Sequence, residues 1–275
     1  MKNKESILRV TAPDKNEFAR LWKEYRPFVI EGVANNWEAY KNWSNDYLSN
    51  KCGNNKVPVR TEVNKPVDNL DDCGYSKREF YQAEEMKFKD YIDLMSGERQ
   101  EIGSRYMSQV DLEKYFPQLT ADVNYPYFFN RKPVVNFWFG CSGINTHLHF
   151  DDEHNIFAQI RGRKKLLLFP PTNYLAFYPP LKEKGAMLHF SKVNPRQPDF
   201  ELFPDFPHQE QQEIILEAGE MLYIPPFWWH WVIGIDETIS LSFWHDLKKI
   251  DLFRQKKAIL TVMDVFYHSK TAAFA

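Results

Sequence analysis

The sequence of 275 residues has little cysteine, little glycine and no long apolar run. Its three cysteines, Cys52, Cys73 and Cys141, lie far apart and form no CxxC pair. This argues against a disulfide framework and a structural zinc site, and it favours a reducing compartment. Only 11 glycines are present, which excludes a collagen-like chain. Because no apolar run suits a signal peptide or a membrane span, we expect a cytoplasmic protein with no membrane contact.

A large excess of charge is also missing. The 35 basic residues nearly balance the 37 acidic residues, so the formal net charge is −2. Overall electrostatics therefore do not recruit nucleic acid, and any such contact would need a local patch. One basic stretch lies in residues 248–257, and we interpret it as the solvated face of a C-terminal helix rather than as a nucleic-acid site.

Aromatic residues are abundant instead. The 22 Phe, 14 Tyr and 8 Trp make up 16% of the chain, a load that disordered chains lack. Half of the tryptophans lie within residues 228–244. The length suits one large domain, which we assign to residues 1–246, with a C-terminal segment over residues 247–275.

The two halves of the chain differ in their hydrophobic pattern. In the first half, helical spacing over residues 14–25, 36–49 and 86–96 alternates with extended runs. The extended runs span residues 28–30, 57–62 and 105–110.

From residue 134 onward the pattern is that of short strands with turns between them, interrupted by a long Pro-rich and aromatic excursion over residues 171–212. The predicted strands span residues 134–141, 144–150, 155–161, 164–169, 213–217, 221–224, 228–233 and 238–244. We therefore predict a mainly β fold with flanking helices and a jelly-roll core. Apolar residues at roughly helical spacing beyond Asp246 predict one or two C-terminal helices.

One predicted strand contains a concentration of metal-binding residue types. If the strand over residues 144–151 is regular, alternation places His147, His149 and Asp151 on one face, and Thr146 on the other. His230 lies on a later strand between large aromatic residues, where a neutral imidazole is favoured. Two histidines and one carboxylate form the ligand set of non-haem Fe(II) oxygenases, although zinc hydrolases use the same types. Taken alone, His230 is also consistent with an ordinary core histidine.

Four stretches of the sequence strongly resemble the JmjC family. They are RPFVIEGVANNW (26–37), THLHFDDEHNIFAQIRGRKKLLLFPP (146–171), GEMLYIPPFWWHW (219–231) and SFW (242–244). The resemblance is greatest to the cupin-like hydroxylase branch, which includes the asparaginyl hydroxylase of hypoxia-inducible factor. It implies a double-stranded β-helix core that uses Fe(II), with 2-oxoglutarate and O₂ as cosubstrates.

The resemblance also implies roles for individual residues. The iron ligands would be His149, Asp151 and His230, whereas His147 falls at a position with no ligand and would line or support the pocket. Lys164 would pair with the distal carboxylate of 2-oxoglutarate, although without the motif it would count as one of a solvated basic run. The other cosubstrate contacts would be Tyr106, Thr146, Asn155 and Ser242.

The sequence departs from the family pattern at Ser242. The hydroxylase that acts on hypoxia-inducible factor has Asn there; serine can still donate a hydrogen bond, so the change bears on the pose of the cosubstrate and not on the iron ligands. By position alone, we assign possible substrate contacts to Gln109, Glu153 and Trp244.

The implied activity is hydroxylation of a C–H bond in a side chain of a protein or peptide, with release of succinate and CO₂. Three alternatives stay open: hydroxylation of a modified tRNA base, histone-lysine demethylation, and a non-catalytic cupin-like binding protein. Similar hydroxylases dimerise through C-terminal helices. The apolar residues beyond Asp246 are too many for an exposed helix pair, so we expect a homodimer; packing back onto the barrel of the same chain is the alternative.

Overall fold

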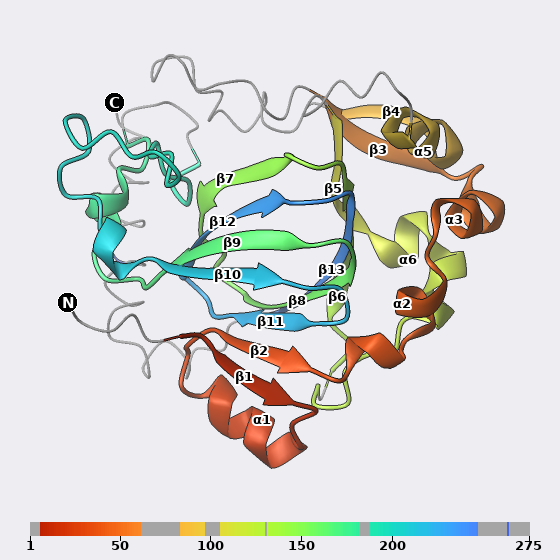
Figure 1. Ribbon diagram of the computed structural model, residues 1–275, viewed down its shortest axis with the longest axis horizontal. Coiled ribbons are helices and arrows are strands. Elements are labelled where there is room, and N and C mark those ends of the chain that lie inside the picture. The colour runs from red at the N-terminus through yellow and green to blue at the C-terminus, as the bar shows by residue number, and fades with distance from the viewer. Residues whose placement is uncertain are drawn as a thin grey trace.

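Two facing β-sheets form the centre of the computed structural model, which describes residues 6–61, 83–96, 105–129, 131–181, 187–246 and Met263 (Figure 1). The smaller sheet has four strands, in the order β10 (Gln212–Leu216), β9 (Lys164–Phe169), β12 (Trp229–Gly234) and β7 (Asn145–His149). The larger sheet has nine strands, in the order β1 (Leu8–Thr11), β2 (Phe28–Glu31), β11 (Met221–Ile224), β8 (His154–Arg161), β13 (Thr238–His245), β6 (Val134–Gly140), β5 (Arg105–Asp111), β3 (Lys56–Thr61) and β4 (Ala83–Lys87).

The eight predicted strands of the second half are all present, each within one residue of its expected ends. Four of them, β11, β8, β13 and β6, form the middle of the larger sheet, and the other four form the whole smaller sheet. From β6 onward, successive strands alternate between the two sheets except for β9 and β10, which flank the excursion and pair with each other in the smaller sheet. This arrangement confirms the predicted double-stranded β-helix core.

The first half of the chain extends the larger sheet at both edges and adds short helices. These are α1 (Lys15–Trp22), α2 (Glu38–Asn42), α3 (Asn45–Cys52), α5 (Phe88–Ser96) and α6 (Leu112–Tyr115). Helix α1 begins after Asp14, whose carboxylate accepts the backbone N–H groups of Asn16 and Glu17 at 2.8 and 2.9 Å.

Two of the helix predictions need correction. The single helix expected over residues 36–49 is two helices: the first ends at Asn42, and Ser44 caps the start of the second by accepting the N–H of Tyr47. The helix expected over residues 86–96 begins only at Phe88, because residues 86 and 87 pair with β3 as the end of β4. Strands β1 and β4 were not predicted at all.

Most of the aromatic residues near His230 pack away from the cleft between the sheets. Trp229 stacks on Phe177 of the excursion, with ring centroids 4.3 Å apart and planes at 9°. Trp231 belongs to the same buried cluster, whereas Trp228 donates its indole N–H to the carbonyl oxygen of Tyr25. Trp229 and Trp231 therefore pack outside the pocket, and the largest group of buried aromatic residues lies in a separate cluster that includes Phe88, Phe116 and Phe137.

The segment after Asp246, which carries the predicted C-terminal helices, the basic stretch and the expected dimer contact, lies outside the described residues apart from Met263. In the described part of the chain, no helix combines the length and the apolar character needed to cross a membrane.

Candidate metal centre

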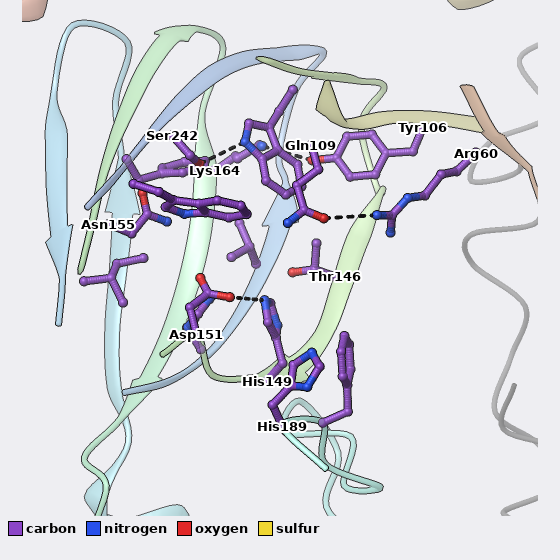
Figure 2. A pocket seen from close by; sticks show the side chains of 17 residues that line it. Arg60, Tyr106, Gln109, Thr146, His149, Asp151, Asn155, Lys164, His189 and Ser242 are labelled. Carbon is purple, nitrogen blue, oxygen red and sulfur yellow. Dashed lines mark hydrogen bonds and ion pairs between the residues drawn. The ribbon is translucent and has the colours of Figure 1, made fainter. Parts of the chain in front are cut away.

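Three potential metal ligands converge where β7 meets β12. His230 lies directly opposite His149 in this antiparallel pair, and Asp151 follows β7 by two residues. The Nε2 atom of His149 is 3.9 Å from Oδ1 of Asp151 (Figure 2). The Nε2 atom of His230 is 3.7 Å from Oδ2 of Asp151. The three ligand atoms all lie within 4.8 Å of one another, and this is the only such cluster found among the described residues. The structure thus brings together the three predicted ligands.

Backbone carbonyls orient both imidazoles. The Nδ1–H of His149 donates to the carbonyl oxygen of His147 at 2.7 Å, and that of His230 donates to the carbonyl oxygen of Trp228 at 2.9 Å. Because a carbonyl oxygen can only accept, each ring must carry its proton on Nδ1, which leaves the lone pair of Nε2 directed into the cluster. This is the tautomer that binds a metal ion.

Burial favours the uncharged forms of His149 and Asp151, the two ligands that are close in sequence. It holds the pKa of the His149 imidazole well below its usual value and raises the pKa of the Asp151 carboxyl group. A neutral imidazole is ready to ligate, and a bound cation would offset the cost of the buried carboxylate.

A bulge in β7 overturns the expected alternation. His149 pairs with His230 but Thr146 pairs with Val232, so β7 advances three residues while β12 advances two. The extra residue turns Thr146 to the same face as His149, and both line the pocket, whereas His147 does not. The prediction that Thr146 and His149 lie on opposite faces is therefore wrong. His147 contacts the site through its carbonyl oxygen, and its imidazole, although not a lining residue, contributes to the lowered pKa of His149.

The remaining predicted residues surround the same pocket, with one exception. All five residues proposed for the cosubstrate line it: Tyr106, Thr146, Asn155, Lys164 and Ser242. Of the three proposed substrate contacts, Gln109 and Trp244 also line the pocket. Glu153 is not among the lining residues. Their roles in binding stay predictions.

Lys164 is buried rather than solvated. Only 3% of it is exposed, and its ammonium group donates to the Tyr106 hydroxyl at 3.4 Å and lies 5.0 Å from the ring centre of Phe157. Within the described residues it forms no ion pair, and burial lowers its pKa to about 7. The pocket therefore offers a poorly compensated cation to an anionic ligand.

Three further polar atoms of pocket residues lack partners. The Thr146 hydroxyl oxygen, the Asn155 side-chain oxygen Oδ1 and the Trp244 indole nitrogen Nε1 are buried, and none has a hydrogen-bond partner in the part of the chain that the structure describes. Buried polar groups are normally paired, so these atoms mark places where a ligand completes the hydrogen bonding.

The sequence did not identify the pocket residues that come from the excursion. His189 and Phe190 both line the pocket. Phe190 forms an isolated β-bridge with His149 and stacks on its ring, with centroids 5.2 Å apart and planes at 13°. The aromatic content of the excursion is the only signal that could have pointed to them, and it gives no position.

The sequence also assigned no role in the pocket to five other lining residues, Arg60, Trp138, Phe157, Ile224 and Val232. Arg60 donates to the side-chain oxygen of Gln109 at 3.2 Å. Gln109 has a φ of 58° at the point where the register of β5 and β6 shifts, a left-handed conformation that is strained for a non-glycine residue. The bulge in β5 turns this side chain into the pocket (Figure 2).

Comparison with known proteins gives one family and several relatives. Residues 14–250 match the cupin-like domain family. Lysine-specific demethylase 8 of Xenopus tropicalis is 31% identical over 225 residues, which cover 80% of this chain and 48% of that protein. The tRNA wybutosine-synthesizing protein 5 of Gallus gallus is 30% identical over 238 residues, 80% of this chain and 71% of that protein.

A third relative is the human bifunctional peptidase and (3S)-lysyl hydroxylase JMJD7, which is 26% identical over 264 residues, 86% of this chain and 82% of that protein. The chain spans about half the length of several other relatives, among them JmjC domain-containing protein D of Dictyostelium discoideum, of which it covers 56%.

Proposed function

The chain belongs to the cupin-like JmjC family, and from this premise we propose that it is an Fe(II)- and 2-oxoglutarate-dependent oxygenase that hydroxylates a side chain of a protein or peptide. The observation that carries the proposal is one pocket that holds both the cluster of His149, Asp151 and His230 and the buried, poorly compensated Lys164. Relatives named as demethylases and as a lysyl hydroxylase support this class of reaction.

The ligand cluster fits a divalent metal ion. Two ligand atoms bound at about 2.1 Å to one ion are at most about 4.2 Å apart, and both His–Asp distances, 3.9 and 3.7 Å, lie within that limit. Three protein ligands leave coordination positions for a cosubstrate and O₂. We therefore assign His149, Asp151 and His230 as the residues that would hold Fe(II).

The opposite end of the pocket fits a dicarboxylate such as 2-oxoglutarate. Lys164 would pair with one carboxylate, with Tyr106 and Thr146 as hydrogen-bond donors to it, and Asn155 and Ser242 would contact the end nearer the metal. Bound Fe(II) with 2-oxoglutarate and O₂ supplies the oxidation, in which a C–H bond becomes C–OH as 2-oxoglutarate is converted to succinate and CO₂. The chain itself orients the reactants and keeps water out with Phe157, Phe190 and the two tryptophans of the pocket.

Carboxylates beside the pocket favour a cationic side chain as the substrate. Burial, together with the charges of Asp152, Asp151 and Asp246, raises the pKa of Glu153. Over the described residues, neither Asp152, Glu153 nor Asp246 forms an ion pair. These three groups repel a polyanion such as tRNA and attract an ammonium or guanidinium group. We therefore favour a lysine or arginine side chain, in keeping with the relative named as a lysyl hydroxylase.

A product assay with defined peptide pools tests this function. The full chain is incubated with Fe(II), 2-oxoglutarate and O₂, together with peptides centred on lysine or arginine, or matched peptides centred on glutamine. We expect products heavier by one oxygen atom from the basic pool alone, with equal succinate formed, and none from an Asp151→Ala variant.

Other products would identify one of the alternatives. Release of formaldehyde from methylated peptides would indicate a demethylase, and oxygen added to tRNA would indicate the base hydroxylase. If no substrate is changed and 2-oxoglutarate is never consumed, the proposed function is wrong and a non-catalytic binding protein is favoured.

A further inference from the structure

Trp138 connects two strands that carry predicted cosubstrate contacts. It lies on β6, between β13 and β5 in the larger sheet, and its side chain lines the pocket. Its indole N–H donates to the hydroxyl oxygen of Ser242 on β13 at 2.9 Å, the dashed line beside Ser242 in Figure 2. On the other side its ring centre is 6.0 Å from that of Tyr106 on β5.

The hydrogen bond fixes which way the Ser242 hydroxyl points. An indole N–H can only donate, so the serine oxygen accepts and its own hydrogen must point elsewhere. Ser242 is fully buried at 0% exposure and lines the pocket, and no described residue accepts that hydrogen. Ser240, equally buried two residues earlier, differs because its hydroxyl donates to the side-chain oxygen of Gln159 at 2.8 Å.

We propose that Trp138 is a positioning residue for the cosubstrate, one that holds the Ser242 hydroxyl as a donor aimed at an oxygen of bound 2-oxoglutarate. This inference rests on the proposed function. A serine hydroxyl rotates freely, whereas the asparagine found at this position in the hydroxylase of hypoxia-inducible factor has donors fixed by the plane of its amide. The indole N–H occupies one lone pair of the serine oxygen and so supplies the orientation that a serine lacks by itself.

A double-mutant cycle on 2-oxoglutarate binding tests the proposal. The full chain is loaded with Zn(II), and the dissociation constant for 2-oxoglutarate is measured by calorimetry for wild type, Ser242→Ala, Trp138→Phe and the double variant. Phenylalanine keeps an aromatic ring on the side of Tyr106 and removes the N–H donor together with part of the indole ring system. We expect Ser242→Ala to weaken binding about twofold to tenfold, the net effect of one hydrogen bond. Trp138→Phe should weaken it by no more than that, and the double variant should equal Ser242→Ala.

Trp43→Phe is the matched control. Trp43 is buried, whereas Trp138 is partly buried; Trp43 also donates its indole N–H to a side chain, Asp122 Oδ2 at 3.0 Å, but it does not line the pocket. The Trp43→Phe substitution should lower the melting temperature and leave 2-oxoglutarate binding unchanged. A second measurement does not require the Trp138→Phe variant to fold. The ¹⁵N-indole resonance of Trp138 in the zinc-loaded wild type should shift when 2-oxoglutarate is added. It should also differ between wild type and the Ser242→Ala variant.

The outcomes separate this inference from the function on which it rests. If wild type fails to bind 2-oxoglutarate, the proposed function is wrong. If wild type binds but Trp138→Phe binds equally well, or if the two single effects add, Trp138 does not act through Ser242 and the inference is overturned. A Trp138 indole resonance that shifts neither on addition of 2-oxoglutarate nor in the Ser242→Ala variant would overturn the inference as well.

Discussion

Among single residues, Lys164 shows most directly how folding and ligand binding oppose each other. Burial lowers its pKa from 10.5 to about 7 in the folded protein, so folding without a ligand disfavours the charged form. Between these two pKa values the unfolded chain binds one proton more than the folded chain. This group therefore makes the free energy of unfolding rise with pH over that window, and its destabilising effect is complete below it.

Replacing Lys164 with methionine should accordingly stabilise the protein and disable it. We expect a higher melting temperature below pH 7, by about 2–4 °C for each kcal/mol relieved. The rise of stability with pH between about 7 and 10.5 should also flatten. Stabilisation by 2-oxoglutarate should disappear. Thermal unfolding across pH, with and without 2-oxoglutarate, measures all three effects.

Lys165→Met is the control for this change, because Lys165 is partly exposed and pairs with Glu213 on the neighbouring strand. It should shift neither the pH slope nor the response to 2-oxoglutarate. A lower melting temperature for Lys164→Met, together with an intact response to 2-oxoglutarate, would return Lys164 to a purely structural role.

The histidines of β7 give a second prediction at this scale. His149→Ala and Asp151→Ala should each abolish tight metal binding and 2-oxoglutarate consumption, because each removes one of three ligands. His147→Ala should keep both, since its contact with the site is through a backbone carbonyl that alanine retains. Metal content after dialysis and succinate formation measure the two properties. Equal losses in His147→Ala and His149→Ala would contradict the assignment.

At the scale of elements, the excursion over residues 171–212 supports the metal centre from outside the barrel. Phe190 bridges to His149 and stacks on its ring, and the flanking backbone adds two hydrogen bonds to β7. The N–H of Phe150 donates to the carbonyl of His189 at 3.0 Å, and the N–H of Ser191 donates to the carbonyl of Leu148 at 2.8 Å. The segment therefore continues the smaller sheet beyond its outer strand.

Removing the Phe190 ring should loosen His149 and weaken metal binding. We expect Phe190→Ala to raise the dissociation constant for Zn(II) by about tenfold, the lower end of the effect of losing a residue that orients a ligand. Phe203→Ala is matched to it, because Phe203 is also a buried phenylalanine of the excursion but does not line the pocket. Both variants should lose stability, and only Phe190→Ala should lose metal affinity in a chelator competition. Equal affinities would mean that the stack merely fills space.

Short β-rich runs separated by turn residues predicted the eight core strands, and several of these strands are buried on both faces, so that an apolar run rather than a period of two marks them. The bulge in β7 could not be predicted in this way, since alternation assumes regular pairing; it was the family motif that placed Thr146 with His149. Strand β4 escaped notice because its sequence, AEEMK, is mostly exposed and lacks an apolar period. The contribution of Phe190 depends on a contact between segments far apart in sequence, which no local pattern encodes.

At the scale of the whole molecule, the homodimer stays a prediction from the apolar residues after Asp246. Met263, the one described residue of that segment, is 62% exposed. We expect light scattering at micromolar concentration to give twice the chain mass of 32.7 kDa. Leu260→Asp with Met263→Asp should reduce it to the chain mass, because burying charge at such an interface is costly. A single-chain mass for wild type would contradict the dimer.

The position of β7 at the edge of the smaller sheet has a consequence for local opening. This strand and the residue pair after it carry two of the three metal ligands, yet on its outer side β7 is held mainly by the short contact with residues 189–191. Edge segments with few partners open without global unfolding, and a bound ion opposes that opening. Backbone amides of β7 and of residues 187–193 should therefore exchange with solvent together once the metal is withdrawn, while those of β8 and β13, at the centre of the larger sheet, stay protected.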